Sequence, residues 1–361
     1  LMIEVIPGTG HVSIGGAVSN NIHGKNAFKS GFFGNHILEI TYINLSNFKI
    51  EKCTREKNSD VFYSIISGLG VLAVVLEVKI NLKKVKHLTV SEKQISLDDI
   101  NSLFKNIDET EEEADYLIAS IDLSSSIKKN SFAKLSYSKI SNVNSKKKKE
   151  FNLFKLLGNH KLIRPLFNFK LTYKIFEQLF GVYSSGLFSS NKEEIKNLFD
   201  SHFLNDVFLP EYNYFFKNGF FEYQCNIPKN NGLEFYNFFL NEMKELEIKP
   251  LMTGLKSYSE AKENFLLSFQ LNEKSYAFTF DFPNVDSNRL KSFFNVLNEK
   301  VISLNGKVYY AKTACLNLNE FESMYGKENV DKFKKIKNKL DPNNLLVNNL
   351  YKRIFLEKEF L

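Results

Sequence analysis

The sequence predicts an α+β fold, and three observations support this prediction. The chain has 361 residues, enough for two domains that each bury a sizeable core. Its first part, residues 1–87, combines many glycines with short β-rich runs. The next part, residues 88–306, has fewer glycines and alternates strand patterns with helical ones. The hydrophobic fraction of 43% and the charged fraction of 25% are those of an ordinary globular protein.

The N-terminal part predicts a strand, a hairpin, and a helix that leads into a further strand. Residues 1–6 have the composition of a strand. HILEITYINL, residues 36–45, alternates apolar and polar side chains and is followed by NFKIEKC, which predicts a β-hairpin. DVFYSIISGLGVLAVVLEVKINL, residues 60–82, begins as a helix and meets two glycines. It continues as the β-branched run 71–80, which predicts a buried strand.

Basic residues are concentrated in the middle of the chain. The run KKKKE at 146–150 predicts a solvated loop. Residues 151–183 interleave Lys and Arg with Phe and Leu, and two interpretations stay open: amphipathic helices packed on the domain, or an element that lies on an anionic membrane surface. The net charge of +7 favours an anionic partner without identifying it.

Several classes of site are absent from the sequence. The three cysteines, Cys53, Cys225 and Cys315, have no metal-ligand spacing, so we expect no metal site or disulfide framework and a reducing cytoplasm. No apolar run of membrane-spanning length occurs. A P-loop and a nucleophile elbow are also missing, as are helix-turn-helix and RNA-binding motifs. Nucleic acid is therefore not an expected partner.

Seven of the 17 glycines lie in GTGHVSIGGAVSNNIHGKNAFKSGFFGNHI, residues 8–37. The start of this stretch is not a dinucleotide fingerprint, because Ser13 stands where the third glycine belongs. A glycine-rich backbone can instead present N–H groups to a diphosphate, or lie flat along a ring system.

This stretch, extended to PGTGHVSIGGAVSNNIHGKNAFKSGFFGNHI, resembles the flavin-binding segment of the vanillyl-alcohol oxidase/p-cresol methylhydroxylase superfamily. Within that superfamily the chain is most similar to the decaprenylphosphoryl-β-D-ribose 2′-oxidase family. FYSIISGLGVLAVV, GKVYYAKTACLNLNEFESMY and KLDPNN continue the resemblance, and GFFEYQCNIP, GLKSYSE and FTFDFP match more weakly. The resemblance spans nearly the whole chain.

The resemblance implies a bipartite FAD-binding domain of the p-cresol methylhydroxylase type, formed by residues 1–87 and 307–361. It implies that residues 88–306 form a substrate domain, an antiparallel sheet flanked by helices. Members of the family carry a further N-terminal lobe that grips the FAD diphosphate. We therefore expect the FAD-binding domain of this chain to be incomplete at its N-terminus.

The resemblance also implies site residues. The predicted FAD neighbours are Gly16, Ser19, Ile22, His23, Gly24, Asn26, Gly70, Val75 and Tyr309. The predicted substrate contacts are Gln224, Lys256, Thr279, Glu222 and His202, of which the last three depart from the family pattern. Lys312 and His23 are the predicted catalytic residues. The strand pattern VYYAK places Lys312 on one face with Tyr310, and a cation there would stabilise negative charge on the reduced flavin.

The implied function is FAD-dependent oxidation of a sugar secondary alcohol to a ketone, at C2′ of a polyprenylphosphoryl-ribose used in cell-wall arabinose synthesis. The implied partners are a lipid-linked or free sugar, an NAD(P)H-dependent reductase, and an anionic membrane surface. We expect a cytoplasmic protein that is peripheral at the inner face of the membrane. Two alternatives stay open: a soluble sugar or aldonolactone oxidase, and a truncated, non-catalytic scaffold.

Overall fold

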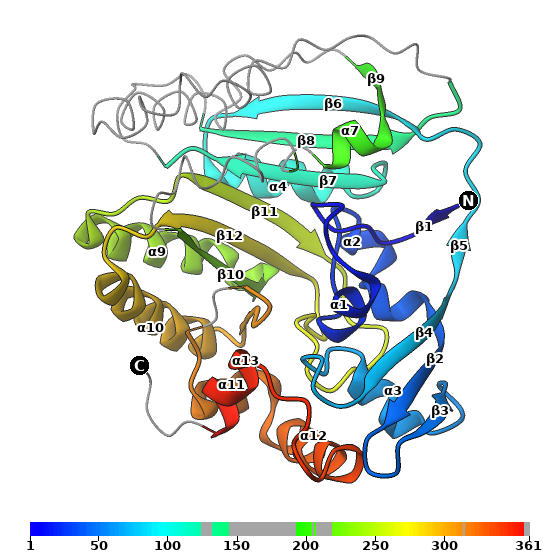
Figure 1. Cartoon of the computed structure of the whole chain (residues 1–361). Helices are drawn as coiled ribbons and strands as arrows, with labels where there is room; N and C mark the ends of the chain where they lie inside the picture. Colours follow the sequence, from blue (N-terminus) through cyan, green and yellow to red (C-terminus); the bar gives the residue numbers. More distant parts are fainter. Residues whose placement is uncertain (124–131, 144–192, 204–205, 207–218, 313–314, 357–361) are drawn as a thin grey trace, which may run out of the picture.

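The computed structural model describes residues 1–123, 132–143, 193–203, 206, 219–312 and 315–356 (Figure 1). The predicted loop at 146–150 and the basic segment 151–183 lie outside these residues. Among the described residues, no helix is both long enough and apolar enough to cross a membrane. The described part combines helices with a large antiparallel sheet, which confirms the predicted α+β class.

An eight-stranded antiparallel sheet forms the larger part of the fold, in the order β13-β10-β12-β11-β7-β8-β6-β9 (Figure 1). The strands span β6 (Thr89–Leu97), β7 (Tyr116–Ile121), β8 (Ala133–Ile140), β9 (Glu194–Asn197), β10 (Phe220–Pro228), β11 (Met252–Tyr258), β12 (Ser275–Pro283) and β13 (Lys307–Val308). Residues 307–308 thus join a sheet whose other strands all come from 88–306.

The two faces of this sheet differ in chemistry because side chains alternate along each strand. On β12, Phe278, Phe280 and Phe282 are buried, whereas Thr279 and Asp281 point to the opposite face. The neighbouring strands β10 and β11 pair with β12 in antiparallel register, so the even-numbered residues of β10 and β11 share a face with the odd-numbered residues of β12. One face is therefore aromatic and the other polar.

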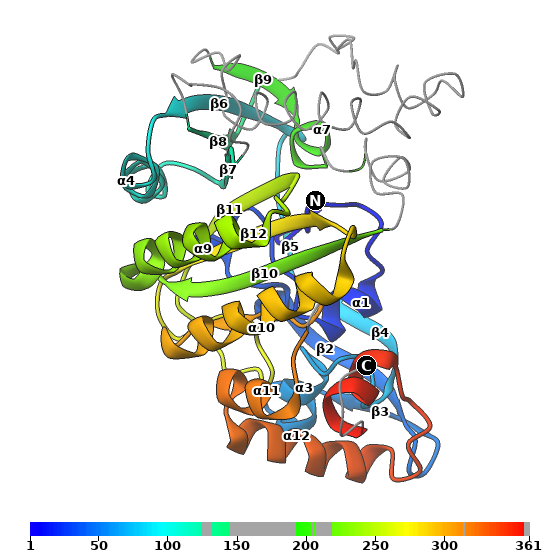
Figure 2. The same ribbon diagram turned by 90° about the vertical axis from the view of Figure 1, so that its left-hand side faces the viewer.

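Three helices cover the aromatic face: α4 (Ile100–Thr110), α9 (Gly232–Leu246) and α10 (Ser287–Ser303). Figure 2 shows α9 and α10 running along the sheet beside one another. Phe239 of α9 stacks on Phe280 with ring centroids 3.9 Å apart, and Phe104 of α4 stacks on Tyr276 at 4.5 Å. Each buried Phe contributes about 1.5–3 kcal/mol by leaving water, which fixes this face as the core.

A second, smaller part of the fold contains the glycine-rich segment. Its elements are β1 (Met2–Ile3), α1 (Ile14–Ser19), α2 (Ala27–Ser30), η1 (Phe33–His36), β2 (Ile37–Asn44), β3 (Lys49–Cys53), α3 (Ser59–Ile65), β4 (Val74–Ile80) and β5 (Leu82–Lys83). Strands β2 and β3 form the predicted hairpin, and β4 pairs with the other edge of β2. β1 pairs with β5, so the predicted first strand is only two residues long.

The prediction of a buried strand over 71–80 is wrong in two respects. β4 begins three residues later, because residues 71–73 are still irregular after the turn that follows α3. It is also largely exposed: Val74 and Leu76 keep 36% and 46% of their surface in contact with solvent. The physical reason is its position, since β4 is the edge strand of the order β3-β2-β4 and only part of it packs on the core.

The C-terminal helices contact both parts of the fold. These helices are α11 (Leu318–Tyr325), α12 (Lys327–Leu340), α13 (Asn349–Tyr351) and the short π-helix η6 (Lys352–Leu356). α11 packs against α10 and β13, and α12 packs against α3. Two further short helices, α7 (Leu198–His202) and η5 (Lys229–Asn231), belong to the region of the large sheet. The buried ammonium of Lys337 on α12 donates to the carbonyl of Val71 at 2.9 Å and forms an ion pair with Asp341. One continuous hydrophobic cluster joins residues of all three sequence regions.

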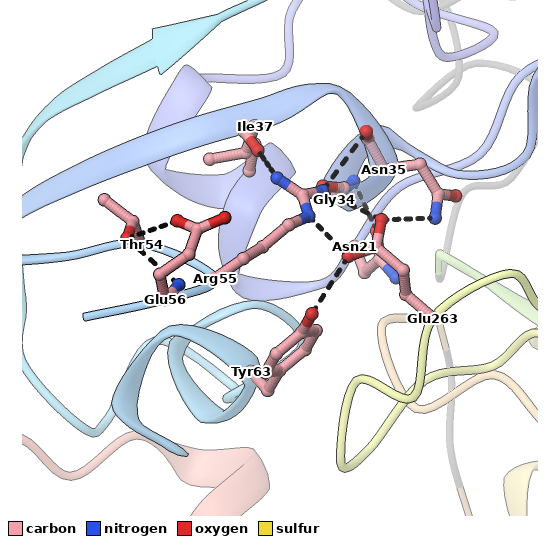
Figure 3. A network of polar contacts seen from close by, with 9 residues as sticks. All are labelled: Asn21, Gly34, Asn35, Ile37, Thr54, Arg55, Glu56, Tyr63 and Glu263. Atoms are coloured by element: carbon pink, nitrogen blue, oxygen red, sulfur yellow. Dashed lines mark hydrogen bonds and ion pairs between the residues drawn. The ribbon is translucent and has the colours of Figure 1, made fainter. Parts of the chain in front are cut away.

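A polar network fastens the glycine-rich segment to the loop between β11 and β12 (Figure 3). The Arg55 guanidinium forms a bidentate ion pair with Glu263, at 2.7 and 2.8 Å, and also donates to the carbonyls of Gly34 and Asn35. Glu263 additionally accepts from the Tyr63 hydroxyl at 3.3 Å. The ion pair is largely buried, with 26% of the Arg55 side chain and 19% of the Glu263 side chain exposed. Burial would raise the pKa of Glu263, but the hydrogen bonds and charge of Arg55 lower it overall.

We predict that Arg55→Ala lowers the free energy of unfolding by about 2–4 kcal/mol, because it leaves the Glu263 carboxylate half-buried without its counter-ion. Urea unfolding followed by circular dichroism measures this change. The matched control is Lys52→Ala, which removes the exposed Lys52–Glu39 pair at 2.8 Å and should cost less than about 1 kcal/mol. Equal losses in the two variants would contradict a special role for Arg55.

Candidate functional site

The candidate site lies on the polar face of the large sheet. Its members on β10, β12 and β11 are Glu222, Gln224, Asn226, Thr279, Asp281, Gly254, Lys256 and Tyr258. Figure 1 shows α1 and α2 between this sheet and the three-stranded sheet. Backbone hydrogen bonds tie the two parts together: the Leu117 amide donates to the Lys25 carbonyl at 2.8 Å, and the Ser259 amide donates to the Ala27 carbonyl at 3.3 Å. The glycine-rich segment is thus held beside the polar face.

The structure brings the predicted residues His23 and Gln224 into contact. Nε2 of His23 lies 3.2 Å from Nε2 of Gln224, and Nδ1 of His23 lies 2.7 Å from the Tyr258 hydroxyl. His23 is buried, and its burial, followed by the positive charges of Lys256 and Lys312, holds its pKa well below the ordinary value. The imidazole is therefore neutral at physiological pH.

Lys312 forms an ion pair with Glu222, with Nζ 2.9 Å from the carboxylate oxygen and 36% of the lysine side chain exposed. Burial alone would lower the pKa of Lys312, but the charge and hydrogen bond of Glu222, together with Asp281, raise it overall. Lys312 is consequently a fixed cation in this structure. Its high pKa makes it a poor proton acceptor.

The predicted strand setting of Lys312 is wrong. β13 ends at Val308, and Lys312 lies in a turn in which its amide donates to the Tyr309 carbonyl at 3.2 Å. The strand stops because β13 pairs with β10 through only two residues, after which the hydroxyls of Tyr309 and Tyr310 bond to the carbonyls of Asn20 and Ser67. The expectation that Tyr310 and Lys312 share one face of a strand therefore does not apply. The ion pair with Glu222 nevertheless directs Lys312 to the polar face of the sheet.

Asp281 is the cross-strand neighbour of Glu222. Burial, followed by the adjacent Glu222 carboxylate, raises the pKa of Asp281 well above its ordinary value, and Lys312 only partly opposes this. Its Oδ1 has no hydrogen-bond partner among the described residues. Two neighbouring carboxyl groups cannot readily carry two negative charges, so Asp281 holds its proton more tightly than an ordinary aspartate does.

Lysines accumulate on the same side of the sheet. Burial is the largest cause that lowers the pKa values of Lys25, Lys134 and Lys256, each to about 8. Lys25 and Lys312 also contribute to the shift of Lys256, and Lys25 contributes to that of Lys134, so these ammonium groups lie within electrostatic range of one another. Glu92 offsets part of this charge and forms an ion pair with Lys196 at 2.8 Å. The local balance is positive.

Of the predicted FAD neighbours, Ile22, Gly24 and Asn26 are buried within the chain. A Cβ at Gly24 would come within 2.6 Å of the Ile6 carbonyl, and the Asn26 amide donates to the Glu4 carbonyl at 2.8 Å. The fold itself therefore requires these residues. Their contact with a cofactor stays a prediction.

Gly16, Ser19 and Gly70 lie together at the outside of α1. The Leu69 amide donates to the Ser19 carbonyl at 3.0 Å, which holds the 67–70 turn against α1. Gly70 has φ +71°, and the neighbouring Gly15 has open space where a Cβ would lie. This small-residue surface with accessible backbone fits the close approach of a large anionic cofactor such as FAD. Val75 is half-buried on β4, whereas Tyr309 is buried beside His23.

His202 lies apart from the His23 contacts. It is buried on α7, where its Nε2 is 2.9 Å from the Ile6 carbonyl and its ring packs edge-on against Tyr116. Burial, followed by the charge of Lys25, lowers its pKa to about 3. These contacts give it a structural task, and its predicted substrate contact is untested.

Sequence reasoning missed Tyr258 and Asp281. A signal was present, since each lies two positions after a predicted site residue on the same strand: Tyr258 after Lys256, and Asp281 after Thr279. Side chains at that spacing share a face. No group of residues that could hold a metal occurs in the described part of the chain.

Most of the chain is similar to known proteins. Residues 80–354 match the model of the family described as D-arabinono-1,4-lactone oxidase. Decaprenylphosphoryl-beta-D-ribose oxidase of Mycolicibacterium smegmatis is 23% identical over an alignment of 370 residues, which covers 99% of this chain and 76% of the relative. Cytokinin dehydrogenase 1 of Arabidopsis thaliana is 27% identical over 78 residues, which cover 22% of this chain and 13% of the relative.

We predict that Lys256 makes stability depend on pH. Its pKa is about 8 in the folded chain against an ordinary 10.5, so between these values the unfolded state binds more protons and stability rises with pH. Lys256→Met removes this contribution. The variant should be more stable than wild type at pH 7, and the difference should shrink towards pH 10.

Urea unfolding at several pH values measures this difference. Lys244→Met, at an exposed position of α9, controls for the substitution itself. A Lys256→Met effect that stays constant from pH 7 to pH 10 would contradict the prediction.

Proposed function

Because this chain belongs to the D-arabinono-1,4-lactone oxidase family, whose members are FAD-dependent oxidoreductases, we propose that it oxidises a secondary alcohol of a phosphate-linked sugar to a ketone. The observation that carries the proposal is the Lys312–Glu222 ion pair, 2.9 Å long, on a polar sheet face that also holds the neutral His23. This polar face combines a fixed cation, a carboxylate and neutral hydrogen-bonding groups, and such a combination suits removal of a hydride and a proton from a carbinol.

FAD, when bound, would supply the acceptor for the hydride, which carries both electrons away from the carbinol carbon. Gly16, Ser19 and Gly70 would hold it on the outside of α1, and Lys312 would supply the positive charge that its reduced form needs. The fixed charge of Lys312 stabilises the negative charge that the reaction creates. The hydroxyl proton goes to a carboxylate, for which Glu222 is the candidate beside Lys312.

The charge of the polar face favours an anionic substrate. Lys25, Lys134 and Lys256 bring more positive charge to this side of the sheet than Glu92 offsets. Keeping like charges together in a partly buried place costs free energy that a phosphate would offset. The similarity to decaprenylphosphoryl-beta-D-ribose oxidase supports the same choice, with C2′ of a polyprenylphosphoryl-ribose as the oxidised position.

The family description supports a second candidate, oxidation of a neutral aldonolactone such as D-arabinono-1,4-lactone. Nothing on the polar face excludes this substrate, but a neutral lactone would leave the positive charge of the lysines without a negative group to offset it. Cooperation with an NAD(P)H-dependent reductase and attachment to an anionic membrane through residues 151–183 stay predictions from the sequence.

The first experiment asks whether the purified chain takes up FAD, seen as visible flavin absorbance, and whether a sugar substrate bleaches it without oxygen. In the FAD-loaded protein, Lys312→Ala should lower the rate of bleaching by about 10²–10³-fold, as for loss of one preorganised electrostatic contact. FAD should stay bound, because its proposed contacts on α1 and the 67–70 turn are elsewhere.

Stopped-flow absorbance measures the bleaching. Lys300→Ala is the control, since Lys300 is also ion-paired, with Glu234, but lies on α10 against the opposite face. A Lys312→Ala rate close to that of wild type removes Lys312 from the mechanism. Failure of the wild-type chain to bind FAD would instead favour the scaffold alternative.

A second experiment separates the two substrates. Lys256→Met should raise the KM for a polyprenylphosphoryl-ribose by about 10- to 100-fold, the scale of one lost charge-assisted hydrogen bond, while kcat changes less. The KM for D-arabinono-1,4-lactone should be unaffected, because the lactone has no charge to lose. Turnover of the lactone alone, with no response to the phosphate-linked sugar, would favour the second candidate.

A further inference from the structure

Three side chains from separate segments of the chain close a triangle of polar contacts. His23 comes from the loop between α1 and α2, Gln224 from β10 and Tyr258 from β11. The Tyr258 hydroxyl is 2.7 Å from Nδ1 of His23, Nε2 of Gln224 is 3.2 Å from Nε2 of His23, and the Gln224 amide is 3.4 Å from the Tyr258 hydroxyl. Both ring nitrogens of His23 therefore have partners within the chain.

Aromatic rings restrict the imidazole on its other sides. Phe32, Tyr258, Phe269 and Tyr309 have ring centroids between 5.0 and 5.8 Å from that of His23. The hydroxyl of Tyr309 does not contact His23, because it donates to the Asn20 carbonyl at 2.9 Å. These ring contacts do not distinguish the two nitrogens of His23. The polar contacts with Tyr258 and Gln224 do.

The triangle determines where the single proton of the neutral imidazole lies. In the amide orientation of the structure, the nitrogen of Gln224 can only donate, so Nε2 of His23 accepts. The ring proton is then on Nδ1 and is donated to the oxygen of Tyr258. The reverse arrangement, with the phenol donating to Nδ1, would require the Gln224 amide to be turned over and Nε2 to be protonated.

We propose that Tyr258 is the positioning residue for His23. The Tyr258 hydroxyl oxygen accepts the proton on Nδ1 of His23, and together with Gln224 it fixes the imidazole in one tautomer and one plane. The consequence for the reaction rests on the proposed function. With both nitrogens engaged, His23 does not take the substrate proton itself, and it presents a neutral, fixed dipole beside Lys312. Removal of the Tyr258 oxygen alone should release this constraint.

The test uses the ligand-free chain of 361 residues, labelled with ¹⁵N at its histidines. Long-range ¹H–¹⁵N correlation spectra separate protonated from unprotonated ring nitrogens, and His23→Gln identifies the His23 signals. We expect a protonated Nδ1 and an unprotonated Nε2. If the wild-type spectrum instead shows a protonated Nε2 and an unprotonated Nδ1, the proposal is overturned without any further variant.

Tyr258→Phe should move both nitrogen shifts of His23 towards averaged values. Nδ1–H loses its acceptor, and the Gln224 amide loses its 3.4 Å contact with the Tyr258 hydroxyl, so the amide can turn over and both tautomers become populated. Tyr309→Phe is the matched control. It removes a hydroxyl from another tyrosine that packs around His23, but this hydroxyl does not bond to His23, so the tautomer should stay unchanged. Identical spectra for wild type and Tyr258→Phe would refute a positioning role.

Reduction of the FAD-loaded protein separates this inference from the proposed function. If Tyr258 acts through His23, Tyr258→Phe and His23→Gln should each lower the rate of sugar-dependent bleaching, and the double variant should lose no more than His23→Gln alone. Fully additive losses would overturn the inference. An absence of sugar-dependent bleaching in wild type refutes the proposed function, while the tautomer measurement still decides the role of Tyr258.

Discussion

The alternation of side chains along β10, β12 and β11 is the constraint on which the rest of the structure depends. Because the three strands share one antiparallel register, each position is committed to the aromatic core or to the polar face. A slip by one residue would move Phe280 to the polar face and Asp281 into the core. The packing of α9 on Phe280 therefore fixes the position of Glu222, and through it that of Lys312.

The polar face becomes a site only because the glycine-rich segment is held against it. Two kinds of contact do this: tyrosine hydroxyls that bond to backbone carbonyls, as Tyr309 does with Asn20, and the Arg55–Glu263 ion pair. Both connect segments far apart in sequence. They act on backbone atoms and charges rather than on apolar surface, so they orient the segment as well as hold it.

The sequence predicted those features whose cause is local. Alternation in HILEITYINL and NFKIEKC was enough for the β2–β3 hairpin, and the α+β class followed from the same kind of pattern. What it could not predict depends on distant partners. β4 is exposed because no described strand pairs with its outer edge, and Lys312 lies in a turn because β13 finds only two partners on β10. The contact between His23 and Tyr258 joins residues more than two hundred positions apart.

The outer edge of β4 has a consequence for assembly. An edge strand presents a row of backbone N–H and C=O groups that can pair with a further strand. Both edges expose apolar side chains, Ile50 on β3 and Val74 and Leu76 on β4. They differ in length and charge, since β3 has five residues with Lys49, Glu51 and Lys52 among them, whereas β4 has seven residues and only two charges. The small sheet is thus better suited to growth on one side than on the other. Glu77 and Lys79 on β4 are then the charges that limit indiscriminate strand addition there.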